Sequence, residues 1–208
     1  MPSRIHLSKV TAELIESFHA CVKEVAMERT YLSIVEPPSV DVLRLAINQN
    51  VVDALPLVVG VEGSKVIGWC SIVRDIRDGF AHTGVLGIGI AKAFRERGLG
   101  RHLLEETLAK ASHIGIVRVE LEVFASNKRA IRFYVREKFE MEGRKRQARY
   151  LDGQFDDIVC MARHIKPSDM AGSACGIQKT DTASVPGLEN SSEYSAAPMK
   201  AAIRKLDQ

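Results

Sequence analysis

The stretch that decides how this sequence is interpreted is Arg95-Glu96-Arg97-Gly98-Leu99-Gly100, which lies between a strand-like and a helix-like segment. Before it, residues 85–90 form an apolar run with β-branched side chains, and after it residues 98–112 carry an apolar stripe with helical spacing. Glycine lets a backbone approach a ligand closely, and the first turn of a helix offers unpaired N–H groups at the positive end of its dipole. The turn is therefore predicted to bind an anionic group such as a pyrophosphate.

Charged side chains surround this turn. Arg95, Arg97 and Arg101 add positive charge and are predicted to contact the phosphates of a bound ligand. Glu96 is unfavourable to an anion, so its side chain is expected to point into solvent. A glycine-containing turn without any ligand is the simpler alternative, because a short glycine motif alone is weak evidence.

A second motif follows downstream, in the segment Leu121-Glu122-Val123-Phe124-Ala125-Ser126-Asn127-Lys128-Arg129-Ala130-Ile131-Arg132-Phe133-Tyr134. It runs from a predicted strand into a predicted helix that Asn127 is suited to cap. The first motif matches the pattern Arg/Gln-x-x-Gly-x-Gly/Ala, and the second matches the pattern Leu-Glu-Val-x-x-x-Asn-x-x-Ala-x-x-x-Tyr. Two motifs in the right order and context are more specific than either alone. The chain therefore resembles the GNAT superfamily of N-acetyltransferases, most closely over residues 65–163.

The remaining pattern alternates between helix-like and strand-like segments, which indicates an α/β (α+β) architecture. The resemblance implies the GNAT fold, a central mixed and mostly antiparallel sheet that is splayed between its fourth and fifth strands and flanked by helices. Strands are predicted at 4–7, 57–61, 65–73, 85–90, 116–124, 140–150 and 155–163, and helices from Thr11, after Pro38, and at 98–112 and 126–138.

Length and composition predict one main domain. A chain of 208 residues with 46% hydrophobic and 26% charged residues has the composition of an ordinary globular protein. Near Pro167 the sequence becomes rich in Ala, Ser, Thr and Gly and loses its large apolar residues. We therefore expect an acetyltransferase domain over residues 1–166 and a flexible, low-complexity tail over residues 167–208.

Several classes of protein are disfavoured by composition. No run approaches the roughly 20 apolar residues that span a bilayer, and the N-terminus lacks the apolar core of a secretory signal, so the expected location is cytoplasmic and without membrane contact. A net charge of +3 is too small to predict nucleic-acid binding. The four cysteines lack the spacing of a zinc site, so no metal is expected; they are Cys21, Cys70, Cys160 and Cys175.

The resemblance implies how acetyl-CoA, the acetyl donor, is held. The pantetheine arm is expected to bond to the main chain of residues 88–90 as an added strand, and one N–H there polarises the thioester carbonyl. The pyrophosphate is expected at the turn before the helix. The cofactor-binding residues implied are Ile88, Gly89, Ile90, Arg95, Glu96, Arg97, Gly98, Leu99, Gly100, Arg101, Asn127 and Tyr134.

Tyr134 and Glu122 are the implied catalytic residues. Tyr134 would protonate or hydrogen-bond the departing CoA thiolate, although it could instead only pack on the buried face of its helix. Glu122 would accept a proton from the substrate ammonium, directly or through water, although it could be a surface carboxylate. Glu120 and His82 are the alternative bases. Many related enzymes carry Glu at the position of Val85, so one usual base position is empty here.

One residue departs from the family pattern. Relatives commonly have glycine before the Phe that follows the second motif's helix, whereas Lys138 precedes Phe139 here. If the helix ends in a left-handed residue, a non-glycine side chain costs about 1 kcal/mol at that position.

The acceptor is predicted less specifically than the donor. With Tyr150-Leu151-Asp152-Gly153-Gln154-Phe155-Asp156-Asp157 included, the chain is most similar to family members that act on free amino acids and similar small amines. Ribosomal-protein N-terminal acetylation is the enzymatic alternative. A non-catalytic acyl-CoA sensor is the alternative of another class, and the intact Tyr134 argues against it. The expected partner is a small-molecule amine, and a homodimer is left open.

Overall fold

The computed structural model describes residues 5–32, 37, 39–48, 55–77 and 79–166. The predicted tail, residues 167–208, lies outside the described residues, as do Arg4 and Pro38.

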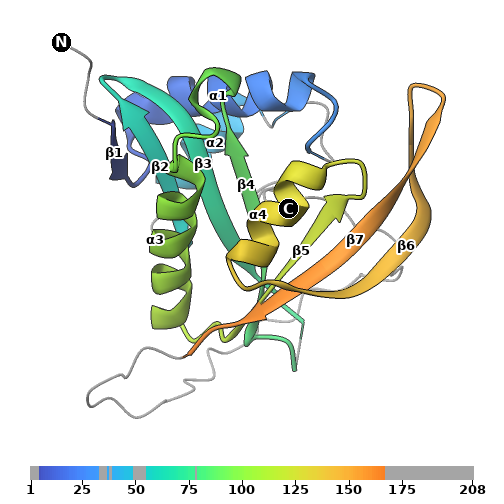
Figure 1. Ribbon diagram of the computed structural model, residues 1–208. Coiled ribbons are helices and arrows are strands. Elements are labelled where there is room, and N and C mark those ends of the chain that lie inside the picture. Colours follow the sequence, from blue (N-terminus) through green and yellow to red (C-terminus); the bar gives the residue numbers. More distant parts are fainter. Residues whose placement is uncertain (1–4, 33–36, 38, 49–54, 78, 167–208) are drawn as a thin grey trace, which may run out of the picture.

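A mixed seven-stranded sheet forms the centre of the molecule, in the order β1-β2-β3-β4-β5-β7-β6 (Figure 1). Only the β4–β5 pair is parallel among the described strands, and the other neighbours are antiparallel. This confirms the predicted fold class. The strands are β1 (Ile5–Ser8), β2 (Leu57–Glu62), β3 (Lys65–Arg74), β4 (Thr83–Ile90), β5 (Arg118–Phe124), β6 (Glu140–Leu151) and β7 (Gln154–His164).

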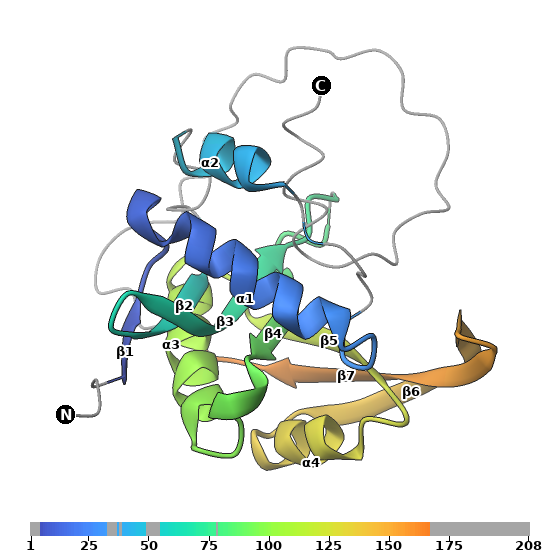
Figure 2. The ribbon, with the colours of Figure 1, turned by 90° about the horizontal axis from the view of Figure 1, so that it is seen from above.

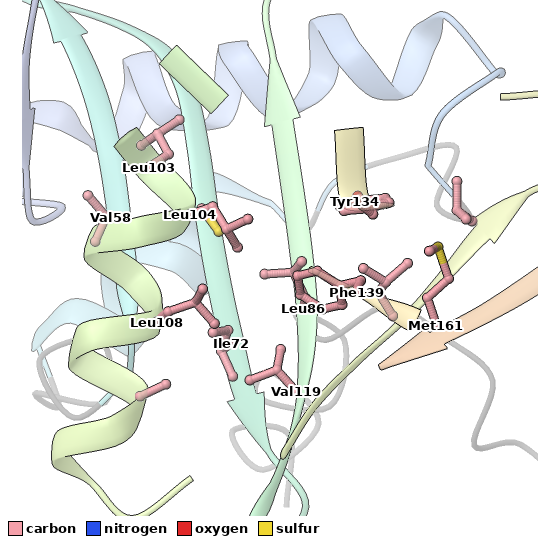
Figure 3. Close-up of a cluster of buried hydrophobic side chains, with 14 of the residues drawn as sticks. Val58, Ile72, Leu86, Leu103, Leu104, Leu108, Val119, Tyr134, Phe139 and Met161 are labelled. Carbon is pink, nitrogen blue, oxygen red and sulfur yellow. The ribbon is translucent and has the colours of Figure 1, made fainter. Parts of the chain in front are cut away.

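Helices cover both faces of the sheet (Figure 2). On one face lie α1 (Ile15–Met27) and α2 (Val40–Asn48), which pack with Trp69 and with Val59 and Val61 of β2 in one apolar cluster. On the other lie α3 (Leu99–His113) and α4 (Lys128–Arg136). Their cluster joins Leu103, Leu104 and Leu108 of α3 to Ile72, Leu86 and Val119 of the sheet, with Tyr134, Phe139 and Met161 beside them (Figure 3). The apolar residues of β2 and β3 are therefore divided between the two helix pairs.

The sheet opens in its middle. Strands β4 and β5 pair over only three positions, from Thr83 with Arg118 to Val85 with Glu120. Beyond these positions β4 continues to Ile90 and β5 continues to Phe124, but the two strands no longer pair with each other, and they diverge in Figure 1. The predicted splay between the fourth and fifth strands is confirmed.

Local geometry explains where the elements end. Lys138 has φ of 64°, so a lysine does occupy the left-handed position after α4. The β6–β7 turn has positive φ at both Asp152 (52°) and Gly153 (75°), which suits the right-handed twist of a tight hairpin. The helix predicted from Thr11 begins as a 3-10 turn at Ala12–Leu14 and continues as α1 from Ile15; the side chain of Thr11, the candidate cap, makes no capping hydrogen bond.

Candidate functional site

The unpaired edge of β4 is the first component of the site. Asp75 donates to the Thr83 carbonyl (2.9 Å) and Ala91 donates to the Ile67 carbonyl (2.9 Å), so the odd-numbered residues of β4 bond to β3. The main chain of Ile88 and Ile90 therefore points toward the diverging β5. Because the pairing of β4 with β5 ends at Val85, the edge of β4 beyond it can accept an extended ligand in the manner of an added strand.

Gly89 differs from its neighbours. In contrast to the prediction, the register directs its main-chain groups toward β3 rather than toward the gap. A Cβ atom on Gly89 would lie only 2.1 Å from the Trp69 ring. Glycine is needed here because the indole occupies the space of a side chain, so the backbone edge depends on Ile88 and Ile90.

The glycine turn leads into α3 as the sequence predicts. Gly98 is the N-cap with φ of 82°, a conformation that strains other residues, and a Cβ there would meet nothing within 4 Å. At Gly100 a Cβ would lie 3.2 Å from Ile90 Cδ1. Leu99 is buried against Gly60 of β2, so only its backbone is available to a ligand. The first turn of this 15-residue helix thus presents backbone N–H groups beside the open strand edge.

The charged residues of the turn have different partners. Arg101 pairs with Glu105 on the exposed surface, and Arg97 lies over the Phe94 ring at 5.5 Å. The Glu96 side chain is 76% exposed, as expected, and it also contacts Arg129 at 3.4 Å. Among the described residues Arg97 has no carboxylate partner, which makes it the cation of this turn most available to a phosphate.

Arg95 is held by the protein itself. Its Nη1 donates to Glu28 Oε2 (2.8 Å), its Nη2 donates to Glu28 Oε1, and its Nε donates to the Ile90 carbonyl (2.8 Å). The guanidinium also lies 4.7 Å from the centre of the Tyr31 ring. The Glu28 carboxylate raises the pKa of this guanidinium. The guanidinium therefore contacts both α1 and the end of β4, and its predicted contact with a phosphate stays a prediction.

Helix α4 supplies the predicted tyrosine. Asn127 caps the helix, with its Oδ1 accepting from the Ala130 N–H at 3.1 Å. Tyr134 is 8% exposed and packs between Phe133 (5.4 Å between ring centres) and Phe139 (5.7 Å). Burial raises the pKa of its phenol, so the group stays protonated at neutral pH. The cluster that contains Tyr134 also packs against Ile88 and Ile90, which brings the tyrosine to the open edge.

Glu122 lies on the opposite face of β5. Its neighbours Leu121 and Val123 point into the Tyr134 cluster, whereas the Glu122 carboxylate is 40% exposed and pairs with Lys145 of β6. This carboxylate raises the pKa of the Lys145 ammonium. Glu122 and Tyr134 therefore lie on opposite faces of the sheet.

The alternative bases are less well placed. Glu120 shares the face of Glu122 but pairs with Arg118, which also binds Glu142. His82 is exposed and precedes β4, and its carbonyl accepts from Val117 and Arg118 at the paired end of the strands. His82 precedes Ile88 by six positions along extended chain, a distance of about 20 Å.

Other residues of this face carry no sequence motif. Arg149 of β6 lies 4.2 Å from the centre of the Phe124 ring, and its Nη2 donates to the Arg29 carbonyl after α1. Arg29 in turn pairs with Asp152 at the hairpin tip (2.6 Å). These contacts join the end of α1 to the β6–β7 hairpin. In the sequence, Arg29 and Arg149 are recognisable only as basic residues.

Metal and membrane features are not found in the part of the chain that the structure describes. There, no group of three or more His, Cys, Asp or Glu residues is arranged to hold a metal ion. None of the described helices has the length and apolar character needed to cross a membrane.

Known proteins share both sequence and fold with this chain. A curated relative, the L-amino acid N-acetyltransferase AaaT of Escherichia coli (strain K12), is 30% identical over 108 residues, which are 51% of this chain and 66% of the relative, just under two thirds of its length. An acetyltransferase of the GNAT family from Streptococcus pneumoniae superposes with a TM-score of 0.71 at 25% identity, covering 78% of this chain and 100% of that structure. The protein yncA from Salmonella typhimurium, solved with its cofactor acetyl-CoA, gives 0.72 at 18% identity, covering 83% and 100%.

The family model for the acetyltransferase (GNAT) family matches residues 23–139. This range includes both motifs, the open edge of β4 and Tyr134, and it covers more than half of the chain. The chain belongs to the GNAT family of acetyltransferases, the acetyl-CoA-dependent N-acetyltransferases.

Proposed function

We propose that this protein transfers the acetyl group of acetyl-CoA to the primary amine of a free amino acid or a similar small amine, by direct attack in a ternary complex. The observation that carries the proposal is the main-chain edge at Ile88 and Ile90, which has no strand partner on the β5 side and lies between the start of α3 and the buried Tyr134. An edge beside a helix N-terminus suits a ligand that is an amide-containing arm attached to a pyrophosphate.

The donor is oriented by backbone groups. The amides of the pantetheine arm pair with the edge of β4, and an N–H of this edge polarises the thioester carbonyl. The pyrophosphate lies at the N-terminus of α3, near Arg97, and the side-chain amide of Asn127 remains free to donate to the cofactor. In this arrangement the thioester sulfur lies toward the Tyr134 face.

The reaction forms one bond and breaks another. The amine nitrogen attacks the thioester carbon and the C–N bond forms. The nitrogen then gives its second proton to solvent water, and the C–S bond breaks with CoA leaving as the thiolate. Because burial raises the pKa of Tyr134 above its ordinary value near 10, proton transfer to a thiolate whose acid has a pKa of about 8.5 is unfavourable. Tyr134 therefore stabilises the thiolate as a hydrogen-bond donor and keeps its proton.

The acceptor approaches from the other face. Helices α3 and α4 and their apolar cluster cover the Tyr134 side, so the amine arrives on the side of Glu122, Phe124 and Arg149. Glu122 accepts the ammonium proton, directly or through water. An α-amine with a pKa near 8 is about one tenth neutral at pH 7, so proton removal increases the reactive fraction.

Two observations support an amino acid as the acceptor. The relative AaaT is an L-amino acid N-acetyltransferase. Arg149 is half-buried on the acceptor face, and its contacts there are an aromatic ring and a backbone carbonyl, so the guanidinium has donors left for a substrate carboxylate.

The test is the release of CoA thiol from acetyl-CoA with a panel of amino acids, polyamines, aminoglycosides and peptides. Turnover with amino acids supports the proposal. Turnover with peptide N-termini alone would assign the protein to the protein-acetylating class, and tight CoA binding without any turnover would assign it to the sensors. The variant Tyr134→Phe is expected to lower kcat while CoA affinity is largely kept, and unchanged kcat would remove Tyr134 from the mechanism.

A further inference from the structure

We propose that Arg95, although it belongs to the glycine-turn signature, is a positioning residue for the acceptor and not a ligand of the CoA phosphates. It holds the end of α1 in place as one wall of the acceptor side. This inference rests on the proposed function, because an acceptor wall has meaning only for a protein that binds an amine next to acetyl-CoA.

The contacts of Arg95 leave little for a phosphate. A guanidinium has five N–H donors, and three nitrogens of Arg95 are already engaged by Glu28 and the Ile90 carbonyl. Its side chain is only 11% exposed. An anion that approached it would also meet the Glu28 carboxylate, which neutralises the charge of the arginine. Arg97, with a ring contact and no carboxylate partner among the described residues, is the better phosphate ligand.

The partner of Arg95 stands where α1 ends. Glu28 is the C-cap of the helix, and the next residue, Arg29, leaves the helix with φ of 54°. Arg95 thus ties the last turn of α1 to the end of β4 through two different contacts, the Glu28 carboxylate and the Ile90 carbonyl. Since Ile90 also belongs to the open edge, one side chain sets the position of α1 relative to the donor.

The same wall is fixed from the hairpin side. Arg29 pairs with Asp152, and its carbonyl accepts from Arg149, so residues 28 and 29 are held from β4 and from β6–β7 at once. The Tyr31 ring lies 4.7 Å from the Arg95 guanidinium and 5.6 Å from that of Arg129 in α4. The wall formed by residues 28–31 is therefore held by contacts with residues of both family motifs. Loss of Arg95 removes the contacts that join this wall to β4.

The experiment compares three arginine variants of the full-length protein. Arg95→Gln is expected to raise the acceptor KM by about tenfold, equivalent to one lost charged hydrogen bond, while the Kd for CoA measured by calorimetry changes less than about twofold. Arg97→Gln is expected to show the reverse split. Arg44→Gln removes an exposed arginine of α2 that pairs with Glu16 in the first turn of α1, and it is expected to change neither constant.

Glu28→Gln supplies the partner test. It is expected to raise the acceptor KM, and the double variant is expected to cost no more than Arg95→Gln alone, because the contact with Glu28 is already lost in that single variant. Exchange of Arg95 and Glu28 for each other is expected to recover part of the loss. A rise in the Kd for CoA in Arg95→Gln that equals the rise in Arg97→Gln, with an unchanged acceptor KM, would overturn the proposal.

Hydrogen exchange separates this proposal from the proposed function. Amides of residues 24–32 are expected to exchange faster in Arg95→Gln and Glu28→Gln than in the wild type, and at the wild-type rate in Arg97→Gln. Exchange that is unchanged in Arg95→Gln would refute the positioning role even in an active enzyme. A wild type that acetylates no amine would refute the proposed function, and the exchange measurement would still decide whether Arg95 holds the end of α1. If Arg95→Gln does not fold, Arg95→Lys provides the same comparison.

Discussion

The left-handed lysine after α4 gives a prediction whose magnitude follows from the backbone. Lys138 has φ of 64°, a conformation that costs a non-glycine residue about 1–2 kcal/mol. Glycine removes that strain but loses about 0.4–1 kcal/mol through the greater freedom of the unfolded chain. Lys138→Gly is therefore expected to raise the free energy of unfolding by about 1 kcal/mol, which corresponds to about 2–4 °C in Tm for a chain of this size.

The assay is thermal and urea unfolding of three proteins, the wild type, Lys138→Gly and Lys138→Ala. The alanine variant removes the exposed lysine side chain and keeps the Cβ atom, so it should be no more stable than the wild type. The turn also holds the end of α4, because Phe139 donates to the Tyr134 carbonyl at 2.9 Å and Lys138 donates to the Val135 carbonyl at 3.0 Å. Equal stability of the glycine and alanine variants would show that strain at φ of 64° is not what distinguishes this helix end.

Three further outcomes follow from the structure. Gly89→Ala places a Cβ atom 2.1 Å from the Trp69 ring, so it should lower the free energy of unfolding by about 1–3 kcal/mol in a urea titration, and a neutral result would contradict the packing. The Gln147 N–H and Arg144 lower the pKa of Asp157, whose contacts hold β6 where its register with β7 shifts between Lys145 and Arg149. The stabilisation by Asp157 is present above its unfolded pKa near 3.9 and is lost as pH falls through the folded value, so Asp157→Asn should flatten the dependence of Tm on pH in that window. Arg149→Gln should raise the KM for an amino acid about tenfold more than the KM for an amine that lacks the carboxylate. An equal rise for both substrates would show that Arg149 does not bind the carboxylate.

The features that could be predicted from sequence are those determined by neighbours in the chain. Asn127 caps the helix that it precedes, and Gly98 adopts the positive φ that the start of α3 requires. The strained conformation of Lys138 follows in the same way from its place after a helix. Because the two family motifs fix the strands and helices around them, the sheet and its splay could be predicted as well.

The features that could not be predicted depend on contacts between distant parts of the chain. The bond from Arg95 to Glu28 spans 67 residues, and the bond from Arg149 to Arg29 spans 120. The sequence places Arg95 in a phosphate motif, and nothing in its local pattern reveals a carboxylate on α1. The direction of the Gly89 main chain likewise needed the β3–β4 register, since a shift of one residue reverses which groups face the gap.

The short β4–β5 junction has a consequence for the ligand-free protein. Three paired positions join the half of the sheet formed by β1 to β4 to the half formed by β5 to β7, and the rest of the boundary consists of backbone groups without a strand partner. In the binding mode proposed above, acetyl-CoA in the gap acts as an inserted strand that joins the two halves of the sheet. At 100 times its Kd the ligand adds about 2.7 kcal/mol to the free energy of unfolding. The amides of Ile88 and Ile90, at the seam between the halves, should gain protection from exchange ahead of those in β2.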